Sequence, residues 1–456
     1  MSTTQFDTAD SKRRERLATI ERSLKSRHAR ERRFRRLGLT AVVSGLVLVA
    51  ILFASILMRG VPAFWQATLY LDVYFDPEVI QISERPVQAP GESDAEFRER
   101  ELAWLGELGR VNWNVLIDEA LKAELPGEIE SRQTRDLRAL VASAERHALR
   151  ERVMHAPELV GQTLKVKMLA SANVDVWLKG NIDRSLPDHR QQLSAQTREW
   201  ADYLAAEGVI RNSFSTALFV NPDSRSSSAS AGLAGAFMGS LFMMLIVIVL
   251  SVPLGVASAI YLEEFAPKNR LTDLIEININ NLAAVPSIVF GLLGAAIFIG
   301  YLRLPLSAPL VGGLVLTLMT LPTIIIATRA SLRSIPPSIR QAALGIGASR
   351  VQTVFHHVLP LALPGILTGS ILGVAQALGE TAPLLLIGMN AFVANVPSSP
   401  LDQATALPVQ IYLWQGNELR NFFEARTSAA IIVLLALMLS LNAVAIWLRK
   451  KFETRW

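Results

Sequence analysis

Residues 226–262 read SSSASAGLAGAFMGSLFMMLIVIVLSVPLGVASAIYL, and none of these 37 residues is charged. About 20 apolar residues are enough for a helix to cross the hydrocarbon core of a bilayer, and soluble folds have no use for so long an uncharged run. The whole chain has 456 residues, of which 51% are hydrophobic and 19% charged, and it contains no cysteine. The composition therefore predicts an α-helical polytopic membrane protein and excludes disulfides, cysteine-ligated metals and thiol catalysis.

Outward from this stretch, the apolar runs predict six membrane-spanning helices. Each run is long enough to cross about 30 Å at 1.5 Å per residue. The predicted spans are 37–58, a helix within 232–261, 282–302, 308–328, 361–388 and 428–447. The fifth contains a single charged residue, Glu380.

Flanking charge predicts the orientation. Residues 12–36 contain 12 Lys or Arg and 3 Glu, and Arg449, Lys450 and Lys451 follow the last span. The loop 329–360 contains four arginines and no acidic residue. The positive-inside rule therefore predicts that both termini and this loop are cytoplasmic, in a bacterial inner membrane. We interpret the basic run as an anchor flank and not as a nucleic-acid-binding segment, because an uncleaved apolar span follows it directly.

Five regions follow from these spans. They are a basic cytoplasmic segment (1–36), the first transmembrane helix (37–58), an extracytoplasmic domain (59–230), a transmembrane domain (231–448) that includes the cytoplasmic loop 329–360, and a cytoplasmic tail (449–456). We expect the inserted domain to be α+β, with helices at 94–107, 134–154 and 191–206 and strands at 163–170, 174–179 and 209–220. Residues 224–230 are expected to form a flexible linker. The histidines of the inserted domain lack metal-ligand spacing, so we expect no metal site and no catalytic site in this domain.

The loop contains the most informative stretch, IRQAALGIGASRVQTVFHHVLPLALP at residues 339–364. Residues 341–344 favour a helix, and Gly345 and Gly347 then allow a turn. Residues 351–358 predict a second short helix with Val351, Val354, Phe355 and Val358 on one side. The small side chains of Ala342 and Ala343 would let another protein approach closely. The pattern predicts a helix–turn–helix at the cytoplasmic surface, although a plain interfacial loop would show similar features.

The order Gln341-Ala342-Ala343, Gly347, Leu359-Pro360 resembles the EAA loop of ABC importer permeases. The resemblance implies that this loop is a coupling helix which binds in a groove of an ATP-hydrolysing subunit, and that these six residues make the ATPase contact. Gln341 stands where the family has Glu, so size and hydrogen bonding are kept and the charge is lost. His357 stands where the family usually has Ile.

Three further stretches resemble the phosphate permeases of the PstA family. They are GETAPLL at 379–385, GVASAIYLEEFAP at 255–267 and AVPSIVFG at 284–291. The resemblance runs from about residue 232 to the C-terminus, and the insertion resembles the long subtype of this family. It implies a type I ABC importer permease fold and transport of phosphate. It also implies three partners: a homologous permease subunit, an ABC ATPase dimer and an extracytoplasmic phosphate-binding protein.

Glu380 is a candidate for the translocation pathway on physical grounds. A carboxylate within a membrane span costs several kcal/mol unless it is paired or hydrated. We expect it to act in gating together with Thr381 and Gln376. In the family an Arg often lies four residues before this Glu, whereas this chain has Gln376, which leaves a hydrogen bond to Glu380 or an arginine from elsewhere. The alternative is a Glu at the interface or in helix packing.

The chain has no Gly-x-x-x-x-Gly-Lys-Ser/Thr motif, so ATP and Mg²⁺ would bind to the partner ATPase and this subunit is expected to be non-catalytic. Three alternatives stay open. One is a permease for another oxyanion such as sulfate or molybdate, which the GETAP run argues against. Another is a membrane-anchored sensor of phosphate status, which does not need six spans. The third is a secondary transporter, which would normally show an internal repeat and more titratable groups within the membrane.

Overall fold

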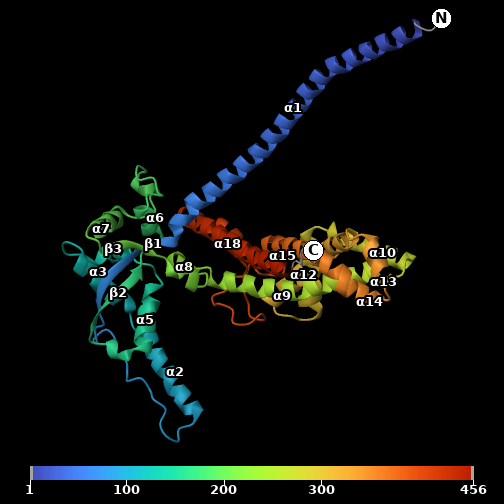
Figure 1. Ribbon diagram of the computed structural model, residues 1–456. Helices are drawn as coiled ribbons and strands as arrows, with labels where there is room; N and C mark the ends of the chain where they lie inside the picture. Colours follow the sequence, from blue (N-terminus) through green and yellow to red (C-terminus); the bar gives the residue numbers. More distant parts are fainter. Residues whose placement is uncertain (1–3, 453–456) are drawn as a thin grey trace. The chain divides into compact units, whose positions relative to one another are not determined.

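The computed structural model describes residues 4–452 (Figure 1). Residues 1–3 of the predicted basic segment and residues 453–456 of the predicted tail lie outside the described residues. The chain divides into two compact units, 1–58 and 59–456. A single helix, α1 (Thr4–Gly60), runs without a break through the predicted basic segment and the first predicted span, and it is long and apolar enough to cross a membrane.

The inserted domain is built on a three-stranded antiparallel sheet in the order β2-β1-β3. The strands are β1 (Trp65–Tyr74), β2 (Thr163–Leu169) and β3 (Ile210–Phe214). Every second residue from Leu69 to Val73 of β1 points to the same face of the sheet, and Leu69, Leu71 and Val73 are fully buried there. The central strand therefore contributes the middle of the domain core. The helices of the domain are α2 (Asp94–Arg110), α3 (Trp113–Glu124), α4 (Thr134–Arg138), α5 (Glu145–His155), α6 (Ala172–Leu178), α7 (Ala195–Ala206) and α8 (Thr216–Val220). The α+β prediction is confirmed.

Several local predictions in this domain were wrong. Residues 174–178 are not a strand but lie in α6, and Lys179 caps its C-terminal end; the Ser171 hydroxyl caps the start of the helix by accepting a hydrogen bond from the N–H of Val174. The predicted helix 134–154 is two helices, and the segment between them forms an isolated bridge from Val141 to Ala170. The predicted strand 209–220 is β3 followed by α8. The central strand β1 and helix α3 were not predicted.

The predicted flexible linker at 224–230 is instead packed into the structure. Arg426 of α18 (Arg420–Phe452) is only 2% exposed, and its guanidinium donates to the carbonyls of Ala229, at 2.9 Å, and Ala231. It also donates to Gln66 Oε1 of β1 at 2.9 Å. A buried guanidinium needs partners for its donors, and the backbone of this segment supplies them. The segment is therefore a fixed junction between the sheet and a membrane helix.

Four more helices are long and apolar enough to cross a membrane. They are α9 (Ala234–Ile260) with the π-helical η6 (Tyr261–Phe265), α12 (Pro309–Arg333), α15 (Leu359–Gly379) and α18. Small residues bring α12 and α15 together, since a Cβ at Gly369 would lie 2.3 Å from the Cβ of Ala327. Such close backbone approach is typical of membrane helix packing.

The predicted third span, 282–302, is the second arm of a bent helix pair together with the break before it, and not one straight helix. α10 (Arg270–Ala283) and α11 (Ser287–Gly294) with η7 (Ala295–Tyr301) meet at an angle of 101°. Pro286 lies at the break, where it lacks an N–H and disfavours a helical conformation at the preceding residue. Counting the bent pair as one span gives the predicted six. The remaining helices are α13 (Pro337–Gly345), α14 (Arg350–Gln352), η8 (Thr353–Val358), α16 (Ala382–Leu386) and α17 (Leu407–Gln415).

Candidate functional site

The first half of the 329–360 loop is helix α13 and the turn that ends it. Gln341 and Ala342 are exposed on α13, whereas Ala343 is only 4% exposed, so Ala343 cannot line a surface open to a partner. Gly347 has φ +91°, the left-handed conformation that favours glycine after a helix. The N–H of Gly347 donates to Leu344 at 3.0 Å, which satisfies one of the last carbonyls of the helix.

The second half of the loop is α14 followed by the π-helical η8, which leads directly into α15 at Leu359 and Pro360, both half-buried. Val354 and Val358 are buried in a small core with Ile260 of α9. Val351 and Phe355 are 55% and 51% exposed. The prediction that these four residues share one side was therefore wrong. Val354 and Val358 lie on a buried side, and Val351 and Phe355 lie on an exposed side.

The loop presents an exposed apolar surface that was not predicted as such. It consists of Leu344 (46% exposed), Ile346 (83%), Val351 and Phe355. Exposed apolar groups on one loop are typical of a surface that contacts another protein or the membrane. The sequence feature that indicates this surface is the pair of apolar residues on either side of Gly345, Leu344 and Ile346. The prediction for this stretch rested mainly on its small residues.

An ion pair fixes α13 to the membrane helices. The Arg340 guanidinium donates to Glu264 Oε1 of η6 at 2.6 Å and to the carbonyls of Leu332 and Ile335 at 2.9 and 2.8 Å. The side chains of Arg340 and Glu264 are 24% and 9% exposed, so water screens this pair only in part. Arg340 directly precedes Gln341, which makes the pair a direct link between the loop and η6.

Two further arginines of the loop region are also paired. Arg329, at the end of α12, donates to Glu263 at 3.2 Å and to Glu276 of α10. Arg333 donates to Glu263 Oε1 at 2.9 Å. The carboxylates of residues 263–276 thus neutralise much of the positive charge that the sequence places in this loop. In the sequence, Glu263 and Glu264 stand out only as part of the stretch 255–267 that resembles phosphate permeases.

Glu380 lies at a break between helices and not inside a continuous span, which corrects the prediction for 361–388. α15 ends at Gly379, Glu380 has φ −74° and ψ 130°, and α16 follows. Glu380 and Thr381 are half-buried and Gln376 is exposed. Among the residues whose side chains the structure describes, the Glu380 carboxylate has no hydrogen bond or ion pair. The expected bond from Gln376 is not formed, because the helix that would place them one turn apart ends between them.

This break packs against the other broken helix. A Cβ at Gly291 of α11 would lie 2.6 Å from the Cα of Pro383, so only glycine allows this approach. The stretches 284–291 and 379–385 therefore meet in space, each next to a helix break. In a membrane, non-helical backbone is tolerated only where protein buries it or where it lines a water-filled cavity. Paired broken helices are a common way to build a transport pathway.

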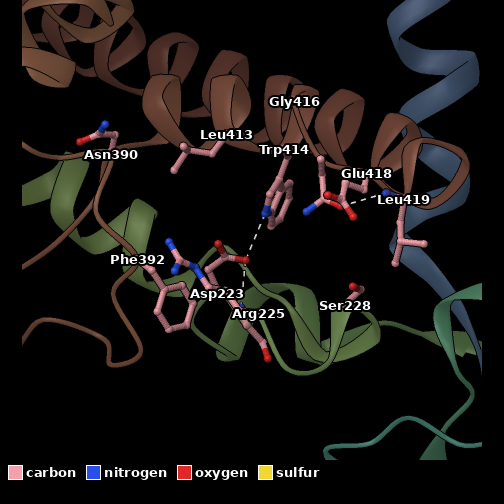
Figure 2. A pocket seen from close by; sticks show the side chains of 12 residues that line it. Asp223, Arg225, Ser228, Asn390, Phe392, Leu413, Trp414, Gly416, Glu418 and Leu419 are labelled. Atoms are coloured by element: carbon pink, nitrogen blue, oxygen red, sulfur yellow. Dashed lines mark hydrogen bonds between the residues drawn. The ribbon is translucent and has the colours of Figure 1, made fainter.

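A cavity of about 660 Å³ lies where the inserted domain meets the end of α17 and the segments before and after this helix (Figure 2). Asp223 accepts hydrogen bonds from Trp414 Nε1 at 3.1 Å and from Gln410 Nε2 at 3.0 Å. The Arg225 guanidinium carbon lies 4.9 Å from the ring centre of Phe392. None of these residues was predicted as a site. Since Asp223 and Glu418 line the cavity together with Arg225, the lining favours no single sign of ligand charge.

Up to six membrane crossings, a loop with an exposed apolar surface and two broken helices in contact define an integral membrane transport subunit. The family model for the binding-protein-dependent transport system inner membrane component matches residues 251–456, and a domain of unknown function (DUF3333) matches residues 21–188. The chain belongs to this family of binding-protein-dependent transport permeases.

Three relatives illustrate the similarity. The probable ABC transporter permease protein YqgI of Bacillus subtilis (strain 168) is 30% identical over 258 residues, which cover 54% of this chain and 86% of the relative. The phosphate transport system permease protein PstA of Xylella fastidiosa (strain Temecula1) is 32% identical, with 48% and 76% covered. PstA 1 of Mycobacterium tuberculosis (strain H37Rv) is 35% identical, with 38% and 58% covered. The predicted fold class, a multi-pass importer permease with an inserted domain, is confirmed.

Proposed function

We propose that this chain is the transmembrane permease subunit of an ATP-driven phosphate importer and forms half of its translocation pathway. The observation that carries the proposal is the meeting in space of the stretches that resemble phosphate permeases. Residues 255–267 supply Glu264 to Arg340 of the loop, and residues 284–291 contact residues 379–385. Relatives that share this half of the chain are named phosphate transport permeases.

The partners follow from this role. The 329–360 loop binds an ABC ATPase dimer, which holds ATP and Mg²⁺ while this chain binds no cofactor. Gln341 and Ala342 contact the ATPase directly, Ala343 supports α13 from inside, Gly347 sets the turn, and Leu359-Pro360 begin α15. A homologous permease subunit supplies the other half of the pathway, and an extracytoplasmic phosphate-binding protein delivers the substrate. Both termini are cytoplasmic and the inserted domain lies on the other side of the membrane.

The contacts of the loop suggest how ATP binding opens the pathway. Alternating access requires that the closed ATPase favours one of two permease conformations. α13 is tied to η6 through Arg340, and η6 continues α9. The loop also leads without interruption into α15, whose far end is the break at Glu380. A displacement of the loop is therefore passed on to both α9 and the break.

Glu380 does not attract phosphate, because a carboxylate repels an anion. We assign it, with Thr381 and Gln376, a gating role in which it pairs with a basic group, supplied by the partner permease, in one of the two conformations. This assignment accounts for a half-buried carboxylate that has no ion pair among the described residues.

The function is tested by uptake of radiolabelled phosphate at low external phosphate, in cells that lack this subunit and in cells that receive it back. Excess sulfate or molybdate serves as competitor. We expect restored uptake that neither competitor reduces. Reduction by sulfate or molybdate would assign another oxyanion, and equal uptake in both cells would favour the sensor alternative.

Glu380→Gln is expected to lower phosphate uptake roughly tenfold, equivalent to about 1.4 kcal/mol, since the neutral amide cannot form the gating ion pair. Glu380→Asp keeps the charge and is the matched control, with a smaller expected loss. Co-purification with the ATPase should be unchanged in both variants. Wild-type uptake by Glu380→Gln would return this residue to a purely structural role.

A further inference from the structure

Four aromatic side chains form a ladder on the surface of the inserted domain, where η1 (Val61–Phe64), β1, β3 and α8 meet. Phe219 stacks between Phe64 and Phe214, with ring centres 5.8 Å apart in both pairs. Trp65 meets the edge of Phe214 at 6.2 Å. We call Phe64, Trp65, Phe214 and Phe219 the aromatic ladder.

Three of the four rings of the aromatic ladder are exposed within the described structure, and Phe64 is half-buried. Trp65 is 46% exposed, Phe214 50% and Phe219 41%, and the neighbouring Val220 is 69% exposed. Contiguous apolar surface of this kind is unfavourable in water and marks a face that another apolar phase covers. Phe64 is the inner end of the ladder and packs against the domain core, whereas Trp65, Phe214 and Phe219 are not among its buried residues.

The ladder is continuous with the ends of the membrane helices. α8 lies close to the start of α9 (Figure 1), and the N–H of Leu233 donates to the carbonyl of Leu218 at 2.7 Å. Trp65 precedes Gln66, which binds Arg426 of α18. From Arg426 to Arg449 the helix rises about 35 Å at 1.5 Å per residue, close to one bilayer thickness. The ladder thus lies at one end of the hydrophobic part of α18, and the basic residues 449–451 lie at the other end.

We propose that the aromatic ladder is an interfacial anchor that inserts into the lipid headgroup region of the leaflet next to the inserted domain. Aromatic rings are favoured at this depth, where one end of an amphipathic ring such as Trp is apolar and the other is wet. Continuity with α9 and α18 selects lipid over a protein partner as the occupant. The anchor holds the domain against the membrane, and this inference does not depend on the transported substrate.

The absence of cysteine from the chain allows single labels to test the proposal. Phe219→Cys is labelled with a small fluorophore in the full-chain complex in lipid nanodiscs, and Leu102→Cys in α2, whose native side chain is 63% exposed, is the control. We expect lipids that are spin-labelled near the headgroup to reduce emission at position 219 and not at 102. Aqueous iodide should reduce emission at 102 more than at 219.

Two results would overturn the proposal. If iodide quenches both positions equally and lipid quenches neither, the ladder faces water. If neither quencher reaches position 219, a protein covers it. Phe214→Cys, which leaves Phe219 stacked on Phe64, repeats the measurement should Phe219→Cys fail to fold.

Discussion

Replacing Gly347 by glutamate is expected to abolish phosphate uptake, while the chain should still insert and accumulate in the membrane. Gly347 has φ +91°, and a residue with a Cβ pays about 1–2 kcal/mol in left-handed backbone. A Cβ here would meet no atom within 4 Å, so nothing in the chain clashes and folding survives. The added charge lies next to Ile346, within the exposed apolar surface of the loop that we propose binds the ATPase. Uptake, membrane abundance and ATPase co-purification measure the three effects separately.

Two controls separate strain from docking. Gly91 has φ +90° and equally free space around it, but it lies in the inserted domain, so Gly91→Glu carries the same strain without touching the loop and should retain uptake. Gly347→Asn introduces a residue that tolerates left-handed backbone and should keep most of the activity. Uptake that persists in Gly347→Glu would remove the coupling assignment from this loop.

The membrane helices were predictable because length and apolarity are local properties, but their breaks were not. Pro253, Pro322 and Pro364 lie inside continuous helices, whereas Pro286 and Pro383 lie at breaks. Whether a proline breaks a membrane helix depends on which neighbours satisfy the freed carbonyls, and a hydropathy pattern contains no such information. The position of Glu380 was misjudged for the same reason.

The inserted domain shows a second limit. The alternation of residues 174–179 favours a strand, but the Ser171 cap and the bond from the Ala67 N–H to Asp175 at 2.7 Å stabilise a helix there. The candidate site also has one part that the sequence could predict and one part that it could not. The glycine turn was visible as a pattern within ten residues, whereas the Arg340–Glu264 pair joins residues 76 positions apart, and only the fold brings them together.

The second large expected effect concerns the ion pair between Arg340 and Glu264. We expect that Arg340→Glu and Glu264→Arg each uncouple ATP hydrolysis from transport. Each substitution places two like charges in a partly buried contact. Breaking a fully buried pair costs about 3–5 kcal/mol, and the partial exposure here lowers that figure. α13 would lose its attachment to η6 while the apolar loop surface remains. We therefore expect phosphate transported per ATP hydrolysed to fall at least about tenfold in reconstituted complexes, equivalent to about 1.4 kcal/mol.

The double variant with both substitutions distinguishes positioning from general destabilisation. It restores opposite charges and should recover part of the coupling ratio, but not all of it. An acidic side chain at position 340 would face the carbonyls of Leu332 and Ile335, which accept hydrogen bonds from arginine in the native chain. Glu92→Arg breaks an ion pair of the same 2.6 Å length in the inserted domain and should leave the ratio unchanged. If the single variants lower uptake and ATP hydrolysis in step, the pair only supports folding, and the mechanical link runs through the start of α15 instead.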